Sequence, residues 1–564
     1  MRHSGMKKNT QAAQSLVECL VANGTDTAFC VPGESYLAVL DALCDVRDSI
    51  KLITCRQEGG TATMAEAYGK LTGRPGVCFV TRGPGATNAS IGVHTAFQDS
   101  SPMIMFIGQV ARDQFDREAF QEVDYRQMFG PLCKWVAEIR DADRIPEYIN
   151  RAYHVAVSGR PGPVVLALPE DMLVEALPAN HVTPLPATPP KAAPDQTTLN
   201  KLAEELANAE HPVMILGGHG WTREAVEDIQ QFAEKQNLPT GCAFRFQDLF
   251  DNNHPNYMGD VGIGINPKLF KRIQGADLIL NVGSRLGEMT SSGYSLLDIP
   301  FPKQKLVMVH TGAEETGHVY RAHLSFTCSL PEMAKALNKL PAENTNQRAD
   351  LVASARADYE SWNNPLGDLK GSKTGDVHLG EIYSYLNKAM PKDAILTNGA
   401  GNYAIWLHRF FRYSTFRSQL APTSGAMGYA LPAALAAKIT APDRPVVCFT
   451  GDGDFMMTCQ ELATAAHHNV PVTILLFNNG MYGTIRMHQE RTYPDRVQAT
   501  ALTNPDFAAL AKAYGLNGVK VSKTEEFAPA FEAALAADKT TLIEIIIDPQ
   551  ALTPGATLDD IRNR

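Results

Sequence analysis

The chain of 564 residues lacks any hydrophobic run that reaches the roughly 18 residues needed for a membrane-spanning helix. Its basic N-terminus, MRHSGMKKNTQAAQSL, is not followed by the apolar segment of a secretory signal. It also lacks clusters of lysine and arginine, and its formal net charge of -10 disfavours nucleic acid as the main partner, because phosphate neutralisation needs grouped cations. We therefore expect a cytoplasmic protein that works on neither a membrane nor a nucleic acid.

The sequence also lacks a Cys-x-x-Cys pair, because its 10 cysteines are scattered and stand mostly inside apolar segments. This pattern disfavours a disulfide framework or a zinc site and predicts reduced, buried thiols. With 44% hydrophobic and 20% charged residues, the composition is that of a globular protein. A chain of this length is too long for a single core, so we expect about three domains.

What the sequence does contain is a regular alternation of short β-branched runs with longer, helix-like stretches. Continuous apolar runs of this kind predict strands that are buried on both faces, and therefore an α/β fold with parallel sheets. The predicted strands include residues 76–81, 102–108, 163–168, 212–217, 278–283, 305–310, 445–451 and 471–479.

Two stretches divide this alternation. Residues 177–194 carry six prolines and can form neither a helix nor a central strand. Residues 341–374 are polar and contain no predicted strand. We therefore predict three doubly wound domains at residues 1–176, 195–340 and 375–564, joined by these two linkers.

Polar residues follow two neighbouring apolar runs near the C-terminus. The segment TGDGDF ends the run at residues 446–450, and Asn479 in FNNG ends the next run, 27 residues after Asp452. The two runs and the helix between them predict a βαβ unit, so both polar segments should meet at the carboxyl edge of the sheet, where open α/β sheets bind ligands. One carboxylate, one amide oxygen and nearby carbonyls suit Mg²⁺ or Ca²⁺ completed by phosphate oxygens.

The glycines of the first segment support the same interpretation. Gly451 and Gly453 let the backbone approach phosphates, and the N-terminus of the helix expected after them favours negative charge. Either segment alone is better explained by ordinary turn chemistry at a strand end.

Together, at this spacing, the two segments resemble the diphosphate motif of thiamine diphosphate (ThDP) enzymes. The resemblance implies ThDP and Mg²⁺ as cofactors, with Asp452, Asn479 and the Met481 carbonyl holding the metal. The family also needs a glutamate from another domain beside the cofactor's aminopyrimidine ring, and CRQEGG places Glu58 there, with Gln57 where histidine is usual. A glutamate in that position can share a proton with the ring and so promote deprotonation of thiazolium C2. Glu58 is otherwise a helix-start residue that complements the helix dipole.

The rest of the chain is similar to the acetolactate synthase-like branch of this family over nearly its full length. Residues 80–108 resemble that branch's Ser-Gly-Pro-Gly-Ala-Thr-Asn loop, with Arg82 in place of serine, and residues 119–124 match its Ala-Phe-Gln-Glu segment. In the family the catalytic glutamate and the metal-binding aspartate meet across a subunit interface, which implies a homodimer or homotetramer. The resemblance assigns cofactor binding to Gly401, Asn402, Tyr403, Gly425, Met427, Gly451, Asp452, Gly453, Asp454, Asn479, Met481, Tyr482 and Gly483.

The substrate side of the site separates two types of reaction. Decarboxylases that protonate their product carry a His-His pair near the positions of Phe120 and Gln121 and a glutamate at the position of Ile485. This chain has neither, and Phe120 and Gln121 are typical of carboligases. The resemblance therefore implies a carboligase that decarboxylates pyruvate or a similar 2-oxo acid and transfers the acyl anion to a second carbonyl. Glu58, Gln121 and Glu34 are the predicted catalytic residues.

Two departures from the family pattern keep other reactions open. Glu34 stands where decarboxylases have an aspartate and acetolactate synthases have no acid, so it is either an acid near the substrate or a solvated turn residue. His488, which with Phe120 and Ile485 is expected near the substrate, replaces the tryptophan that selects the acceptor in the branched-chain biosynthetic enzymes. The alternatives are a non-ligating decarboxylase, a ThDP lyase or acetyltransferase for a 2-hydroxyacyl compound or sulfoacetaldehyde, and a non-catalytic binding protein.

The middle of the chain gives the weakest signal. LGGHG at residues 216–220 and SRLGEMT at residues 284–290 lie where flavin-bearing relatives hold FAD, but the second lacks their Arg-Phe-Asp-Asp-Arg run. A lone glycine-rich turn does not distinguish a flavin site from a structural turn, so FAD binding stays open.

Overall fold

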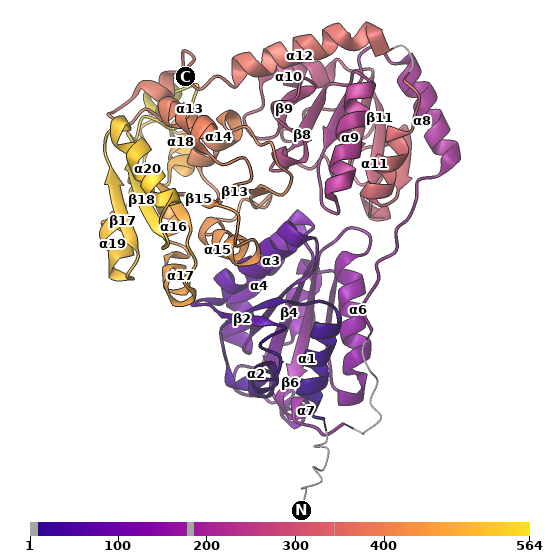
Figure 1. The fold of residues 1–564 in the computed structure, drawn as a ribbon, viewed down its shortest axis with the longest axis vertical. Coiled ribbons are helices and arrows are strands. Elements are labelled where there is room, and N and C mark those ends of the chain that lie inside the picture. Colours follow the sequence, from indigo (N-terminus) through magenta and orange to yellow (C-terminus); the bar gives the residue numbers. More distant parts are fainter. Residues whose placement is uncertain (1–9, 178–184, 343–344, 564) are drawn as a thin grey trace, which may run out of the picture. The chain divides into compact units, whose positions relative to one another are not determined.

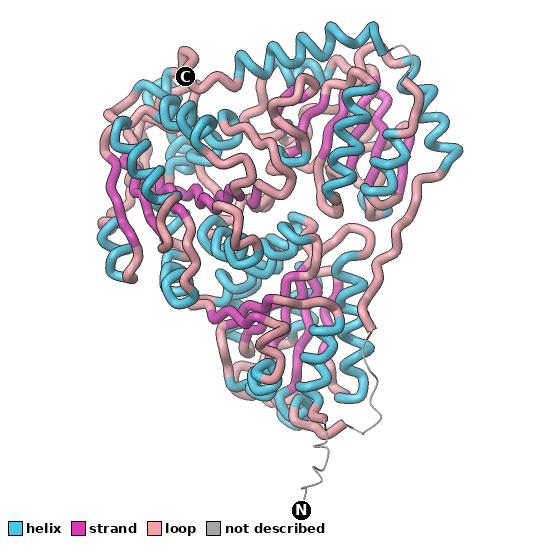
Figure 2. Tube along the Cα trace, viewed as in Figure 1, coloured by secondary structure: helices cyan, strands magenta, loops and turns pink. Residues whose placement is uncertain are grey.

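The computed structural model of the protein describes residues 10–177, 185–342 and 345–563. These residues contain three six-stranded parallel sheets with helices packed around them (Figure 2). The predicted α/β class with doubly wound parallel sheets is therefore confirmed. By internal contacts the chain forms two compact units, Met1–Pro190 with the first sheet and Lys191–Arg564 with the other two. Part of the predicted proline-rich linker, residues 178–184, lies outside the described residues.

The sheet of the first unit has the strand order β2-β1-β3-β4-β6-β5. Because the order reverses beside β1, the carboxyl ends of β1 and β3 form a switch point at which ligands bind in such sheets. Its strands are β1 (Thr27–Cys30), β2 (Lys51–Thr54), β3 (Gly76–Val80), β4 (Met103–Gln109), β5 (Trp135–Glu138) and β6 (Pro163–Pro169). Its helices are α1 (Ala12–Ala22), α2 (Leu37–Cys44), α3 (Glu58–Thr72), α4 (Gly83–Asp99), α5 (Tyr125–Phe129), α6 (Ile145–Val157) and α7 (Glu170–Leu173).

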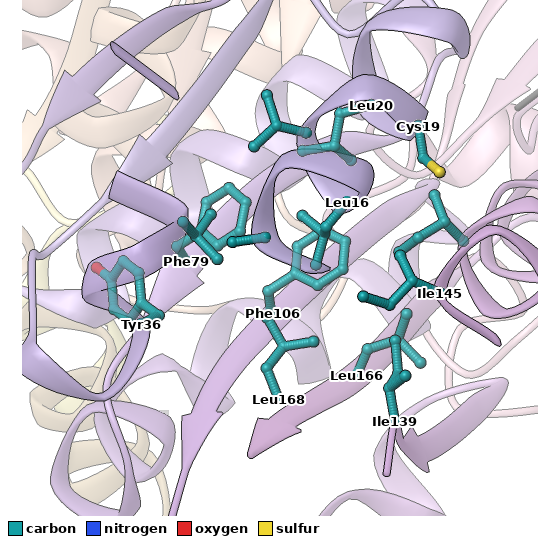
Figure 3. Packing of buried hydrophobic residues seen from close by; sticks show 14 of the residues in the cluster. Leu16, Cys19, Leu20, Tyr36, Phe79, Phe106, Ile139, Ile145, Leu166 and Leu168 are labelled. Atoms are coloured by element: carbon teal, nitrogen blue, oxygen red, sulfur yellow. The ribbon is translucent and has the colours of Figure 1, made fainter. Parts of the chain in front are cut away.

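One core of this unit lies between the sheet and α1 (Figure 3). The rings of Phe79 on β3 and Phe106 on β4 stack with centroids 4.9 Å apart, and Leu16 and Leu20 of α1 belong to the same buried cluster. Burial of each such side chain contributes about 1.5–3 kcal/mol to folding. The core thus fixes the strands whose carboxyl ends carry the candidate site.

In the second unit, the first sheet has the order β12-β11-β10-β7-β8-β9. Its strands are β7 (Val213–Leu216), β8 (Thr240–Ala243), β9 (Tyr257–Val261), β10 (Leu278–Val282), β11 (Lys305–His310) and β12 (Leu324–Thr327). The helices are α8 (Gln196–Asn208), α9 (Arg223–Lys235), α10 (Pro267–Gln274), α11 (Leu330–Asn338) and α12 (Ala349–Trp362). The stretch expected to be a linker, residues 341–374, thus contains a regular helix, α12, which packs on β9 and α10 (Figure 1).

The last sheet has the order β14-β13-β15-β16-β18-β17. Its strands are β13 (Ile395–Asn398), β14 (Gln419–Leu420), β15 (Val446–Gly451), β16 (Thr473–Asn478), β17 (Asn517–Val521) and β18 (Thr541–Ile546). Its helices are α13 (Leu379–Ala389), α14 (Asn402–Phe410), α15 (Ala430–Thr440), α16 (Asp452–Phe455), α17 (Leu462–His468), α18 (Gly483–Thr492), α19 (Phe507–Ala513), α20 (Phe527–Leu535) and α21 (Leu558–Arg562).

The two sheets of the second unit are joined by the segment that follows β8. The Arg245 guanidinium donates hydrogen bonds to the carbonyls of Pro422 and Gly399, the latter at 2.9 Å. The Asp248 carboxylate accepts from the backbone N–H of Ser418 at 3.0 Å. This segment therefore fixes two loops at the edge of the last sheet, on either side of α14.

Two further expectations concern the whole chain. No helix of the described residues is both long and apolar enough to cross a membrane. The described ranges include all 10 cysteines, which form no disulfide and are mostly buried.

Candidate active site

The two polar segments near the C-terminus lie side by side at the carboxyl edge of the last sheet. Strands β15 and β16 are parallel neighbours, and their register pairs Gly451 with Phe477. Asp452 therefore follows the end of one strand, and Asn479 follows the end of the adjacent strand. The structure thus brings together the two halves of the pattern from which the site was inferred.

The Asp452 carboxylate is buried and held by three donors. Its Oδ1 accepts from the N–H of Gly453 at 2.9 Å, and its Oδ2 accepts from the N–H of Gly480 at 2.9 Å and from Asn504 Nδ2 at 2.8 Å. Burial raises the pKa of Asp452, and the hydrogen bonds from Gly453 and Asn504 oppose that rise. None of the ion pairs among the described residues involves this carboxylate. A buried acid with no counter-charge of its own suits a bound cation.

The other oxygen donors at this edge come from the loop after β16. Asn479 is half-buried, and its Oδ1 accepts from the N–H of Met481 at 3.3 Å. Within the described ranges no group of three or more His, Cys, Asp or Glu could hold a metal ion. A metal at Asp452 would therefore need amide, backbone and phosphate oxygens beside the carboxylate, and the ligand set of Asp452, Asn479 and the Met481 carbonyl stays a prediction.

Asp454 has a different role from Asp452. Its carboxylate is fully enclosed and accepts from the Tyr403 hydroxyl at 2.7 Å, the Gly428 N–H at 2.7 Å and the Thr450 hydroxyl at 2.8 Å. Burial raises its pKa in spite of these bonds. Asp454 therefore ties the start of α14, the end of β15 and the loop that contains Gly428 together.

Tyr403 lies inside the domain rather than at the open edge. Its ring stacks on Phe477 with centroids 6.1 Å apart, and its hydroxyl also accepts from the N–H of Gly399 at 2.9 Å. The phenol is therefore engaged by protein groups, and contact of Tyr403 with a diphosphate stays a prediction. The neighbouring Asn402 accepts from the Thr484 hydroxyl at 2.8 Å, which links the start of α14 to α18.

The remaining predicted cofactor residues lie on loops around this edge. A Cβ atom on Gly453 would lie 2.6 Å from the Tyr482 ring, so only glycine permits this close approach. Gly425 adopts a left-handed conformation with φ 67°, and the half-buried Met427 follows it. Tyr482 precedes Gly483, the first residue of α18, and Gly401 precedes Asn402, the first residue of α14.

The helix expected after Gly451 and Gly453 is present but begins farther along the chain than phosphate binding by its N-terminus would need. The structure has a single turn there, α16, and the next α-helix begins only at Leu462. A single turn carries little macrodipole, so the attraction for phosphate that we expected from this helix is small. Backbone N–H groups of the loops remain the available donors.

Glu58 is the first residue of α3 in the first unit and is half-buried. Its Oε2 accepts from Asn88 Nδ2 of α4 at 2.9 Å, and among the described residues no hydrogen bond engages its Oε1. Gln57, at the family's histidine position, caps α3 by accepting from the Gly60 N–H at 3.0 Å. Glu58 is thus oriented at one oxygen while the other stays available.

The predicted substrate residues of the first unit differ in exposure, and Gln121 is half-buried. Phe120 is 72% exposed, and Gln121 follows it in a left-handed conformation with φ 65°. Glu34 is exposed at the start of a short 3-10 helix, Glu34–Tyr36, next to the carboxyl end of β1. In the second unit, Ile485 and His488 are exposed one turn apart on α18.

Three residues that support this site are absent from the sequence prediction. Asn88 and Asn504 hold the oxygens of Glu58 and Asp452, and Arg245 fixes the loops beside α14. Asn504 stands 25 residues beyond Asn479 and reaches the site because the Leu502 N–H binds the Gly480 carbonyl at 2.8 Å. No local pattern marks such a residue, since only the folded loop brings it back.

The glycine-rich turns of the middle sheet pack against each other. The Gly217 N–H donates to the Val282 carbonyl at 3.0 Å, and a Cβ atom on Gly218 would lie 2.2 Å from the Gly283 carbonyl oxygen. The glycines are therefore explained by this close packing alone.

The fold is that of an α/β protein with a buried aspartate beside Asn479 at one sheet edge and, in the other unit, a glutamate oriented by Asn88. Three sequence models of thiamine pyrophosphate (ThDP) enzymes match this chain. The model of the N-terminal TPP binding domain matches residues 10–128, that of the central domain residues 199–337, and that of the C-terminal TPP binding domain residues 399–545. The chain belongs to this family, in its acetolactate synthase-like branch.

Named relatives match almost end to end. A probable acetolactate synthase large subunit of Methanocaldococcus jannaschii is 30% identical over 98% of this chain and 95% of its own length. The acetolactate synthase large subunit of Corynebacterium glutamicum is 30% identical, over 99% of this chain and 91% of its own length. The acetolactate synthase isozyme 2 large subunit of Escherichia coli is 29% identical, over 95% of both chains.

Proposed function

We propose that this protein is a ThDP- and Mg²⁺-dependent carboligase that decarboxylates pyruvate or a similar 2-oxo acid and transfers the acyl anion to a second carbonyl. The observation that carries the proposal is the pairing of a buried, uncompensated Asp452 with the Asn479 loop at one sheet edge. The acetolactate synthase names of the full-length relatives support ligation as the outcome.

The residues of the last sheet would hold the cofactor through its metal. Asp452, Asn479 and the Met481 carbonyl would bind Mg²⁺, and Asn504 would keep the second oxygen of Asp452 in place. ThDP, when bound, supplies the electron sink for decarboxylation. Asp454 and Tyr403 support the loops around the diphosphate and need not touch it.

Glu58 would hold and move a proton at its Oε1 atom. Asn88 donates to Oε2 and so fixes the direction in which Oε1 points. A carboxyl group that is oriented and half-buried suits reversible proton transfer with the aminopyrimidine ring of the cofactor. We further propose, from the family resemblance, a homodimer or homotetramer in which Glu58 of one subunit and Asp452 of another serve one cofactor.

The residues proposed for the substrate side favour ligation over protonation. Gln121 would orient the acceptor carbonyl with its amide, which donates a hydrogen bond without giving up a proton. Phe120, Ile485 and His488 would contact the substrates. Ile485 occupies a position where a protonating decarboxylase has an acid, and its side chain is apolar and 55% exposed.

Several finer assignments complete the proposal. The division at residues 1–176, 195–340 and 375–564 and the cytoplasmic location stay predictions from the sequence. The chemistry described does not need a flavin. Binding of FAD stays an open prediction, which the visible absorption spectrum of the purified protein tests.

Product analysis tests the proposed function. The purified protein is incubated with ThDP, Mg²⁺ and pyruvate, alone and with a panel of aldehyde and ketone acceptors. Acetolactate, acetoin or another ketol supports the proposal. Acetaldehyde as the sole product supports a non-ligating decarboxylase instead, a candidate that the exposed carboxylate of Glu34 favours. Turnover only of sulfoacetaldehyde or a 2-hydroxyacyl compound would assign the lyase or acetyltransferase alternative.

A further inference from the structure

We propose that Arg82 is a positioning residue that fixes the Phe120–Gln121 loop. Glu170 holds the Arg82 side chain in place, and the Arg82–Glu170 pair thereby favours ligation of the acyl anion over its protonation. The inference deepens the proposed function and rests on it. Arg82 stands where the family loop carries serine, so it is a feature of this chain's own sequence.

Arg82 lies between helix α7 and the loop. Its side chain is only 9% exposed, forms an ion pair with the Glu170 carboxylate through Nη2, and donates from Nη1 to the Phe120 carbonyl at 3.3 Å. Removing a guanidinium from water is costly, and a single half-exposed carboxylate compensates only part of that cost. A buried arginine that also binds a loop carbonyl is therefore best explained by its hold on that loop.

The loop needs such a hold because its backbone is strained. Asp116, Glu118 and Gln121 have φ angles of 62°, 52° and 65°, in a region that residues with a Cβ atom rarely adopt. Within the loop, the Glu122 carboxylate accepts from the N–H groups of Asp116 and Ala119 at 2.8 and 2.9 Å. These bonds order the loop internally and leave its attachment to the sheet to other residues.

That attachment comes from the first residues after β3. The Gly83 N–H donates to the Gln121 carbonyl at 2.9 Å, and a Cβ atom on Gly83 would lie 2.9 Å from the same oxygen. Arg82 binds the carbonyl of Phe120, one residue earlier. Two consecutive carbonyls of the loop are thus held by two consecutive residues, which sets the direction of both side chains.

The direction of Gln121 is the link to the reaction. Its Oε1 is enclosed and has no hydrogen-bond partner among the described residues. With the acceptor oxygen enclosed, the NH₂ group is what the side chain has left to offer a substrate, and such a group can orient a carbonyl but is not an acid. A loop released from Arg82 would let Gln121 turn and water enter, and the acyl anion would then be protonated more often.

The variants are Arg82→Met, Arg82→Lys and Glu170→Gln, with Arg112→Met as the matched control. Arg112 pairs with the next residue of α7, Asp171, at 2.7 Å and also with Glu175, is 32% exposed, and donates to the Arg140 carbonyl instead of the Phe120 carbonyl. Two readouts are measured on the full-length protein with ThDP and Mg²⁺: the ratio of ketol to aldehyde formed from pyruvate, and the backbone amide hydrogen exchange of residues 116–122.

In Arg82→Met we expect the product ratio to fall at least about tenfold and exchange in the loop to accelerate by a similar factor, since small displacements at a reacting centre have large effects. Glu170→Gln should shift both readouts in the same direction, Arg82→Lys should recover part of the loss, and Arg112→Met should change neither. If Arg82→Met leaves loop exchange at the wild-type rate, or if Arg112→Met alters it equally, Arg82 is not the positioning residue. If loop exchange accelerates in Arg82→Met but the wild-type protein forms no ketol from any donor, the proposed function is wrong, and the positioning of the loop by Arg82 is still supported.

Discussion

Asp452 and Asp454 belong to one short segment but have different roles because their hydrogen-bond partners differ. Asp452 sits at the open edge of the sheet with donors on both oxygens and no cationic partner among the described residues. Asp454, two residues later, is enclosed by Tyr403, Gly428 and Thr450. The sequence marks both residues equally, and only the hydrogen-bond partners of the second assign it to the support of the surrounding elements.

A prediction at the residue scale concerns Asn504, whose amide donates to Asp452 at 2.8 Å and to Asn478 at 3.0 Å. Asn504→Ala should weaken Mg²⁺ and ThDP binding about 10- to 100-fold, because it removes the group that orients a proposed metal ligand. Equilibrium dialysis or calorimetric titration measures the affinity. Asn387→Ala, which removes a half-buried asparagine with two bonds elsewhere in the same domain, is the control and should bind normally. Unchanged affinity in Asn504→Ala would contradict the role.

How far the sequence predicts single residues depends on where their partners lie. Asp452 and Asn479 follow strand ends, so their positions come from the local pattern and the βαβ rule, whereas Glu58 was assigned by the family resemblance. Asn88, Asn504 and Arg82 act through contacts with distant segments. Their roles could not be predicted, because a hydrogen bond between residues far apart in sequence leaves no periodic signal.

At the scale of elements, the C-terminal helix α21 is bound to α18, which begins directly after the proposed metal loop. The Glu490 carboxylate of α18 is buried and pairs with Arg562 of α21 at 2.9 Å and with Arg486 at 2.8 Å. Met487 and Ile561 belong to the small apolar cluster between the two helices. The end of the chain thus supports the element that carries Ile485 and His488.

A prediction at this scale follows from the charge of Glu490. Hydrogen bonds, first from Arg562, lower the pKa of Glu490 to about 2, below the ordinary value of 4.5. The stabilisation is therefore complete above about pH 4.5 and is lost as the pH falls towards 2. Glu490→Gln should lower the free energy of unfolding by roughly 1–3 kcal/mol at pH 7.

Urea unfolding of wild type and variant at pH 7 and at pH 3 measures this difference, which should shrink at the lower pH. The exposed pair of Asp368 with Lys373 gives the control, since Asp368→Asn should change stability by less than about 0.5 kcal/mol. A difference between wild type and Glu490→Gln that is independent of pH would contradict the assignment.

Helices and strands were predicted well where the hydrophobic pattern is strong, and poorly where packing against other elements determines whether a helix forms and where it begins. Buried apolar runs predicted β15 and β16 to within a residue or two, because strands covered on both faces must be continuously hydrophobic. The start of the helix after Gly453 was misplaced, and the helix α12 was not predicted. The first forms the single turn α16 and then α17 from Leu462, and the second is polar over much of its surface and is stabilised by β9 and α10.

At the scale of the whole molecule, the second unit joins two sheets through polar groups as well as apolar ones. Asp260 lines a cavity between β9, α12 and α14 together with Tyr359 and His408. Its Oδ1 has no hydrogen-bond partner among the described residues. Burial raises the pKa of Asp260 to about 7, although the charge of Arg245 opposes the rise.

Asp260 therefore makes the stability of this unit depend on pH. Between pH 3.8 and 7 the unfolded chain releases the proton while the folded chain keeps it, so the free energy of unfolding falls as the pH rises. Asp260→Asn should stabilise the protein by more than about 1 kcal/mol at pH 8 and by little at pH 4. Thermal unfolding at the two pH values measures this, with Asp113→Asn, an exposed aspartate, as the control. Destabilisation by Asp260→Asn at pH 8 would contradict the account.

The central claim, that this chain activates ThDP through Glu58, can be tested before any substrate is known. Exchange of the thiazolium C2 proton with deuterium oxide is measured by NMR on protein saturated with ThDP and Mg²⁺, for wild type, Glu58→Gln and Glu332→Gln. Glu332, a half-buried glutamate in the first turn of α11, is the matched control. We predict that Glu58→Gln slows the exchange at least about 100-fold, while Glu332→Gln exchanges at the wild-type rate. Exchange in Glu58→Gln at the wild-type rate, with ThDP bound, would contradict the account.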